Sequence, residues 1–123
     1  MKKRALTLAA TGLALVGILA AGSAQAAENR CGWIENPTPG NWWLTDAEGQ
    51  WTMMTQGSYE AAGMDTIGDI SAGDYVATNV NYGYACGCMR VDTDGEGVIT
   101  RIYSFRQIPL GKCESDGALP SPG

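Results

Sequence analysis

The chain of 123 residues contains no histidine and only one phenylalanine. Histidine is the commonest general base and a usual ligand of catalytic zinc, so its absence excludes Ser-His and Cys-His nucleophile pairs and most catalytic zinc sites. The sequence also lacks a glycine-rich phosphate-binding loop. An enzyme built on this chain would have to work with carboxylates, as glycoside hydrolases do. We therefore expect no cofactor.

Positive charge is scarce outside the N-terminus. Beyond Lys2, Lys3 and Arg4, five basic residues stand against 13 acidic ones, which leaves a net charge of −8. Nucleic acids and anionic membrane surfaces bind basic faces, so we expect neither as a partner. The acidic balance favours solubility, or association with a cationic protein.

Long hydrophobic runs are absent except near the N-terminus. A positively charged start precedes an apolar run over 5–21, and the small residues Ala24 and Ala26 follow. This order is typical of a cleavable signal peptide, and the run is at the short limit for a membrane anchor, the alternative interpretation. We expect a signal peptide over 1–26 and a single domain over 27–123, located in the periplasm or secreted.

The four cysteines are Cys31, Cys86, Cys88 and Cys113. An even number in a short exported domain predicts two disulfides, whereas a zinc site usually shows C-x-x-C pairs. In extended geometry the Cα atoms of Cys86 and Cys88 would lie about 6.6 Å apart on one side of a strand, near the upper limit for a mutual bridge. We therefore expect each of them to bond a distant cysteine. Which chain end pairs with which stays open.

Turn-forming residues divide the chain into short segments rich in β-favouring residues. Strands are predicted over 41–46, 50–55, 75–80, 84–91 and 98–108. The segment 56–74 has no clear period, and whether it is an ordered loop stays open. The tail over 118–123 is expected to fray. The sequence thus predicts an all-β domain of about five or six short strands, a small barrel or compact sandwich pinned by two disulfides.

Tryptophan and tyrosine are the most suggestive candidates for a binding site. Trp42 and Trp43 are adjacent, so on a strand they face opposite sides and cannot both enter one core. Exposed aromatic rings bind glycans and protein partners. The alternative is that all but one of these rings belong to the core. The candidate binding residues are Trp33, Trp42, Trp43, Tyr82 and Tyr84.

Carboxylates offer two further possibilities. Asp92, Asp94 and Glu96 alternate before Gly97, as at the start of a calcium loop, but Tyr103 stands where such a loop needs a bidentate glutamate. We therefore predict no metal site. Acids available to a hydrolase lie mostly in predicted turns, and none is predicted to be catalytic. They are Glu35, Asp46, Glu48, Asp92, Asp94 and Glu96.

Several short motifs occur together along nearly the whole of 27–123. They are Cys31-Gly32-Trp33, the turn Asn36-Pro37-Thr38-Pro39-Gly40-Asn41, Trp43-Leu44-Thr45-Asp46, Gly49-Gln50-Trp51-Thr52, Asn81-Tyr82-Gly83-Tyr84, Cys86-Gly87-Cys88 and the late Cys113. In combination they resemble the bacterial family catalogued as domain of unknown function 4087. The resemblance implies an exported bacterial protein with this four-cysteine frame, and it implies no activity.

These observations favour an exported, non-enzymatic binding module with an unknown protein or glycan partner. Its ligand would contact an aromatic surface on a disulfide-pinned β scaffold. One alternative is an inhibitor or immunity protein against a basic secreted enzyme, because the domain is acidic. The other is a carboxylate-dependent hydrolase, which would need two acids that converge in a cleft.

Overall fold

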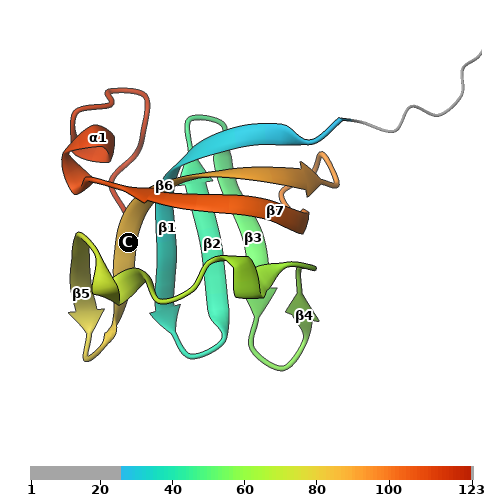
Figure 1. The fold of residues 1–123 in the computed structure, drawn as a ribbon, viewed down its shortest axis with the longest axis horizontal. Coiled ribbons are helices and arrows are strands. Elements are labelled where there is room, and N and C mark those ends of the chain that lie inside the picture. Colours follow the sequence, from blue (N-terminus) through green and yellow to red (C-terminus); the bar gives the residue numbers. More distant parts are fainter. Residues whose placement is uncertain (1–25, 123) are drawn as a thin grey trace, which may run out of the picture.

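The computed structural model describes residues 26–122 (Figure 1). Apart from Ala26, the predicted signal peptide lies outside the described residues. The strands are β1 (Glu28–Thr38), β2 (Asn41–Asp46), β3 (Gly49–Thr55), β4 (Tyr59–Glu60), β5 (Tyr75–Asn79), β6 (Tyr82–Thr93) and β7 (Ile99–Ile108). The helices are the two 3-10 turns η1 (Met64–Thr66) and η2 (Ile70–Ala72) and the short α1 (Leu110–Glu114).

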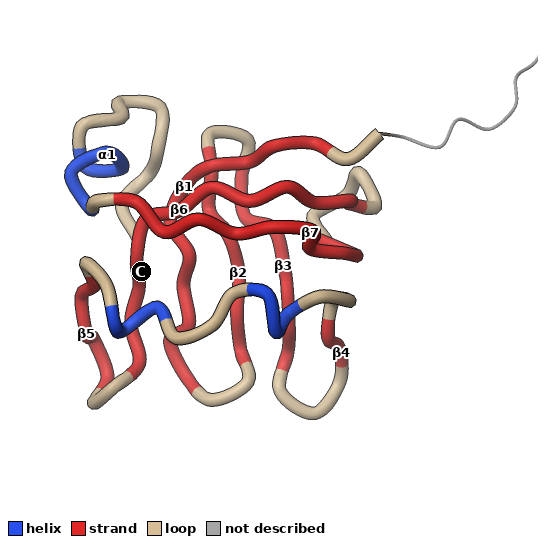
Figure 2. The backbone as a smooth tube through the Cα atoms, in the orientation of Figure 1, coloured by secondary structure: helices blue, strands red, loops and turns tan. Residues whose placement is uncertain are grey.

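All seven strands form one antiparallel sheet that curls into a nearly closed barrel. The order is β4-β3-β2-β1-β6-β5, and β7 also pairs with β6. Isolated bridges from Thr52 to Val98 and from Ala62 to Arg101 bring β7 back towards β3, and Figure 2 shows β7 crossing over β2 and β3. The predicted all-β, barrel-like domain is therefore confirmed.

β6 organises the barrel because it pairs with three strands. One of its edges pairs with residues 28–36 of β1. Its other edge pairs first with β5, through residues 82–85, and then with β7, through residues 86–93. It therefore supplies a pairing edge to β1, β5 and β7.

Two disulfides fasten the chain ends to β6. Cys31 of β1 bonds Cys88, and Cys113 of α1 bonds Cys86, with sequence separations of 57 and 27 residues. The prediction that each central cysteine reaches a distant one is confirmed, and the structure decides the pairing. Loops of this length correspond to about 4 kcal/mol each in the chain-entropy account of disulfide stabilisation.

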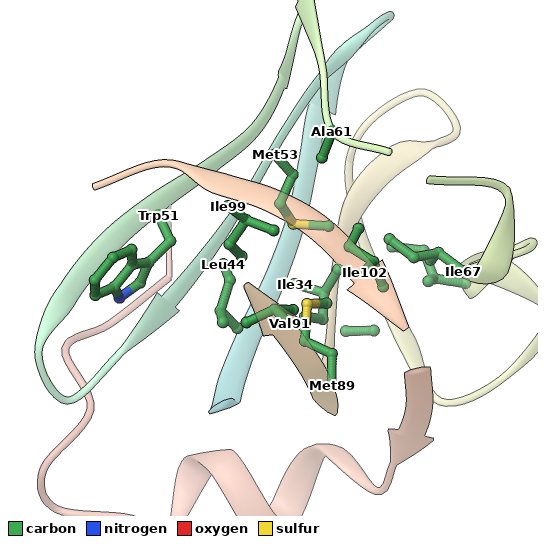
Figure 3. Close-up of a cluster of buried hydrophobic side chains, with 12 residues drawn as sticks. Ile34, Leu44, Trp51, Met53, Ala61, Ile67, Met89, Val91, Ile99 and Ile102 are labelled. Atoms are coloured by element: carbon green, nitrogen blue, oxygen red, sulfur yellow. The ribbon is translucent and has the colours of Figure 1, made fainter. Parts of the chain in front are cut away.

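The main core fills the barrel interior. Side chains from β1, β2, β3, β6 and β7 point towards one another, and Ile67 joins them from the connection between β4 and β5 (Figure 3). Ile70 of the same connection also belongs to this core. The fully buried members with the largest side chains are Ile34, Leu44, Met53, Val91 and Ile99. The loop over 56–74 is thus ordered by apolar contacts that its weak periodicity does not reveal.

A second, smaller cluster lies on the outer face of the sheet. Trp33 is the neighbour of the core residue Ile34 on β1. Because successive side chains of a strand point to opposite faces, the Trp33 ring lies away from the barrel interior. There it packs with the buried disulfide Cys86–Cys113. The C-terminal helix therefore covers part of the outer face.

Arg30 lies at the end of the barrel formed by the first residues of β1, which pair with β6 but not with β2. Arg30 Nη1 donates to Asp46 Oδ2 at 2.7 Å, and Nη2 donates to Glu28 and to Glu48 at 2.9 and 3.1 Å. Its guanidinium lies 3.8 Å from the ring centre of Trp51, whose Nε1 also donates to Asp46. Burial lowers the pKa of Arg30, but the hydrogen bonds to Asp46 and Glu48, together with the charges of Asp46 and Glu28, outweigh it and raise the pKa above its ordinary value.

The hairpin between β5 and β6 contains a strained residue. Asn79 pairs with Tyr82, so the turn consists of Val80 and Asn81. Val80 has a φ of 57° and is 83% exposed. A β-branched side chain is disfavoured at positive φ, and this one receives little burial in return.

Two strands were not predicted from the sequence. The prediction treated Asn36 to Gly40 as a turn and assigned no strand before it, whereas β1 continues to Thr38. Gly32 lies within β1 and does not interrupt it. A glycine is needed at this position because a Cβ would clash with the carbonyl oxygen of Thr45 on β2. The second omission is β4, which has only two residues.

Among the described residues, no helix has the length and apolar character needed to cross a bilayer. The two disulfides are typical of proteins that mature in an oxidising compartment.

Replacing Val80 with glycine should stabilise the domain. The change removes about 1–3 kcal/mol of backbone strain from the folded state. This gain exceeds the cost of roughly 0.5–1 kcal/mol that glycine adds by making the unfolded chain more flexible. We expect Val80→Gly to raise the free energy of unfolding in urea by about 1 kcal/mol. The control Thr78→Gly, on exposed β5 backbone without positive φ, should lower it by roughly 0.5–1 kcal/mol. Equal effects of the two changes would contradict the strain at Val80.

Removing the carboxylate of Asp46 should be costly, whereas removing that of Glu48 should not. Asp46→Ala leaves the buried Arg30 guanidinium without its main partner, and we expect a loss of about 3–5 kcal/mol in the free energy of unfolding. Glu48 has a 69% exposed side chain, so Glu48→Ala should cost roughly 0–1 kcal/mol. Urea denaturation at constant salt measures both, and similar losses would contradict the role given to Asp46.

Candidate functional site

A pocket of about 210 Å³ lies between the turn of the β1–β2 hairpin, η2 and the β5–β6 hairpin. Asn79 Nδ2 donates to the carbonyl oxygen of Pro37 at 3.3 Å and joins the two hairpins beside it. The pocket is smaller than the roughly 300–1,000 Å³ of pockets that enclose a drug-sized molecule. It therefore suits one ring of a larger ligand. Its lining residues are Asn36, Trp42, Gly68, Asp69, Ile70, Ser71, Tyr75, Asn81 and Tyr82.

Three aromatic rings line this pocket. Trp42 and Tyr75 are half-buried and pack against the main core, so the barrel supports them from behind. Tyr75 donates its hydroxyl hydrogen to the carbonyl oxygen of Asn81 at 2.7 Å, which fixes its ring against the hairpin turn. Tyr82 is also half-buried, at the first position of β6. The rings are thus held on strands and not on free loops.

Polar groups alternate with the rings around the same pocket. Asn36 Nδ2 donates to the carbonyl oxygens of Thr38 and Asn41, and no donor of the described chain binds its Oδ1. Asp69 Oδ1 accepts from both the backbone N–H and the hydroxyl of Ser71, at 3.0 and 2.6 Å. Within residues 26–122, Asp69 Oδ2 has no hydrogen-bond partner. The pocket therefore offers acceptors to a ligand that carries hydroxyl or ammonium donors.

The protonation states at the pocket are well defined near neutral pH. Hydrogen bonds from the Ser71 side chain and backbone hold the pKa of Asp69 below its ordinary value of 3.8, so its carboxylate is charged. Burial, and then the nearby Asp69 charge, raise the pKa of Tyr75 above its ordinary value of 10.0, so its phenol stays neutral. The pocket presents one negative charge and neutral donors.

The five aromatic residues predicted as binding candidates fall into three places. Trp42 and Tyr82 meet at the pocket just described. Trp33 and Tyr84 pack edge to face on the outer surface, with ring centres 5.2 Å apart. Trp43 is half-buried opposite Glu35 on β1, and its buried Nε1 has no hydrogen-bond partner among the described residues.

Two of the three acids of the calcium-like segment, Asp92 and Asp94, have structural partners. Asp94 Oδ1 accepts from the backbone N–H groups of Glu96 and Val98, which shapes the turn before β7. Asp92 Oδ2 accepts from the hydroxyl of Tyr103 at 2.6 Å, and this bond raises the pKa of Tyr103. Between residues 26 and 122, no group of three or more Cys, Asp or Glu side chains is placed to hold a metal ion.

The remaining hydrolase candidates also have structural contacts. Glu35 is buried and accepts from Thr45 Oγ1 at 2.6 Å. Asp46 and Glu48 both bind Arg30. These bonds orient the carboxylates towards the protein's own donors.

Sequence reasoning missed several residues of the pocket, namely Asn36, Asp69, Ser71, Tyr75 and Asn81. The spacing of Asp69 and Ser71 is that of an Asx turn, in which an aspartate side chain accepts from the backbone two residues on. That signal predicts a fixed turn inside 56–74. It does not predict that the turn meets Trp42 and Tyr82.

Comparison with known proteins supports a family assignment. No curated protein and no solved structure matches the chain. The family described as "Protein of unknown function (DUF4087)" matches residues 25–120, which include β1 to β7, all four cysteines and every residue that lines the aromatic pocket. The chain belongs to this family.

Proposed function

We propose that this domain is an exported, non-enzymatic binding module that holds one sugar ring of a glycan in the pocket of Trp42, Tyr75 and Tyr82. The observation that carries the proposal is that three supported aromatic rings and several open polar groups line one small pocket. The N-terminal pattern and the two disulfides support export to the periplasm or the outside of the cell.

The chemistry of the pocket matches that of a saccharide. The C–H faces of a sugar ring are apolar and pack on aromatic rings, while its hydroxyls require precisely placed polar groups to fix orientation. Asn36 Oδ1 and Asp69 Oδ2 are acceptors for those hydroxyls. The rings and the acceptors thus serve opposite parts of the same ligand.

Charge narrows the class of glycan. Asp69 is ionised at the pocket, and residues 27–123 carry a net charge of −8. An anionic sugar would be repelled by both the local carboxylate and the overall field. A neutral or amino sugar fits better.

The test uses the exported chain, residues 27–123, on an array of neutral, amino and acidic glycans. We expect binding to at least one neutral or amino glycan, and saturation-transfer NMR should show contact between aromatic protons and one terminal ring. Tyr82→Ala should raise the dissociation constant roughly tenfold, which corresponds to a loss of about 1.4 kcal/mol in binding free energy. The matched control Tyr103→Ala removes a half-exposed tyrosine from β7, outside the pocket, and should leave binding unchanged.

Two outcomes would overturn the proposal. One is that no glycan binds, and the other is that a glycan binds equally well to Tyr82→Ala. If a protein partner binds instead, with the same sensitivity to Tyr82→Ala, the pocket is a binding site but its ligand is not a glycan.

Glycan binding at this pocket should not depend on pH between pH 7 and about pH 4. Because the pKa of Asp69 lies below 3.8, its carboxylate remains an acceptor from pH 7 down to about pH 4, and affinity should fall only below that. Ser71→Ala removes the main cause of the lowered pKa and should move the loss of affinity to higher pH. NMR titration of the Asp69 carboxyl checks the shift without a ligand. A decline in affinity between pH 7 and pH 5 would contradict the role given to Asp69.

A further inference from the structure

The outer face of the sheet holds a second aromatic site, separate from the pocket of Trp42, Tyr75 and Tyr82. Trp33 and Tyr84 meet edge to face at an interplanar angle of 85°, on β1 and β6. A pocket of about 240 Å³ opens beside them and is lined also by Cys113, Glu114, Asp116, Leu119, Pro120, Ser121 and Pro122. Seven of the nine lining residues therefore come from the chain's own C-terminal segment.

The tail residues contact the aromatic pair through few polar bonds. Trp33 Nε1 donates to the carbonyl oxygen of Pro120 at 3.0 Å, and Leu119 packs against the cluster around Trp33. Upstream, Asp116 turns the chain by accepting from the backbone of Ala118 and Leu119. In the described chain, the indole bond is the only hydrogen bond that joins residues 119–122 to the sheet.

The tail has the composition of a polyproline ligand. Pro120 and Pro122 fix their own φ, and each disfavours the helical region for the residue before it, so residues 119–122 are pre-organised in an extended form. Aromatic grooves recognise such segments because a rigid proline chain pays little entropy on binding and leaves its carbonyls free for donors. An indole N–H on a proline carbonyl beside a second aromatic ring provides this chemistry.

We propose that Trp33 and Tyr84 form a proline-recognition groove, which the chain's own residues 119–122 occupy and which binds a proline-rich, basic segment of a partner when that tail is displaced. The basic character follows from the acids in the same lining. Glu114 and Asp116 are exposed beside the tail, so a lysine or arginine next to the partner's prolines would meet two carboxylates.

Occupation by the tail sets the affinity for the partner. The disulfide Cys86–Cys113 keeps residues 119–122 close to the groove, so the tail competes at a high effective concentration. A partner segment binds only the fraction of molecules whose groove is open. Weakening the tail should therefore strengthen binding of the partner segment.

The experiment follows the Trp33 indole N–H signal by ¹⁵N NMR in the exported chain, residues 27–123. The probe is a synthetic peptide that contains the sequence of residues 119–122 once, with one added lysine at each end. Two variants weaken the tail without changing any residue of the sheet: Leu119→Ser and Pro120→Gly. We expect both to move the Trp33 indole signal, to bind the peptide at least tenfold more tightly than the unaltered chain, and to recover the original signal position as the peptide saturates.

The controls separate this groove from the glycan pocket and from simple charge attraction. A peptide with alanine in place of both prolines should not bind, and one with glutamate in place of both lysines should bind at least fivefold more weakly. Tyr82→Ala should leave peptide binding unchanged, because Tyr82 lines the other pocket. The proposal is overturned if the tail variants bind the peptide no better than the unaltered chain, or if the alanine peptide binds as well as the proline peptide.

Discussion

The structure depends on β6 being held at two positions on one of its faces. Cys86 and Cys88 lie two residues apart, so their side chains point to the same side of the strand and each reaches a different end of the chain. The same strand gives β1, β5 and β7 their pairing edges. A chain this short buries only about 60–65% of the surface that it exposes when unfolded, so such cross-links stabilise a barrel whose core alone is small.

Side chains alternate between the two faces of the sheet, and this places the aromatic rings on two separate surfaces. Trp33 and Ile34 are neighbours in sequence, yet Ile34 enters the barrel core and Trp33 packs outside it. Trp42 and Tyr82 meet Tyr75 at the hairpin ends instead. Arg30 is paired with three carboxylates, and residues 27–123 keep a net charge of −8, so both aromatic surfaces lie on an acidic domain that disfavours anionic ligands.

Much of the fold was predictable because strand alternation and turn residues are local signals. The predicted strand 41–46 coincides with β2, and 98–108 differs from β7 by a single residue. β1 was not predicted because Asn36 to Gly40, with two prolines, is typical of a turn. The glycine at position 32 is explained only by the close approach of Thr45. Of the candidate pocket, Trp42 and Tyr82 were identified in advance, whereas Asp69 and Tyr75 were not.

The sequence by itself determined the all-β class, the pairing of Cys86 and Cys88 with distant partners, and the absence of histidine-based chemistry. These properties follow from composition and from spacing along one strand. The tertiary structure alone decided that Cys88 bonds Cys31, that Trp42 and Tyr82 share a pocket with η2, and that the carbonyl oxygen of Pro120 accepts from the Trp33 indole. Such contacts join residues far apart in the chain, and they depend on how the sheet curls, which no local pattern encodes.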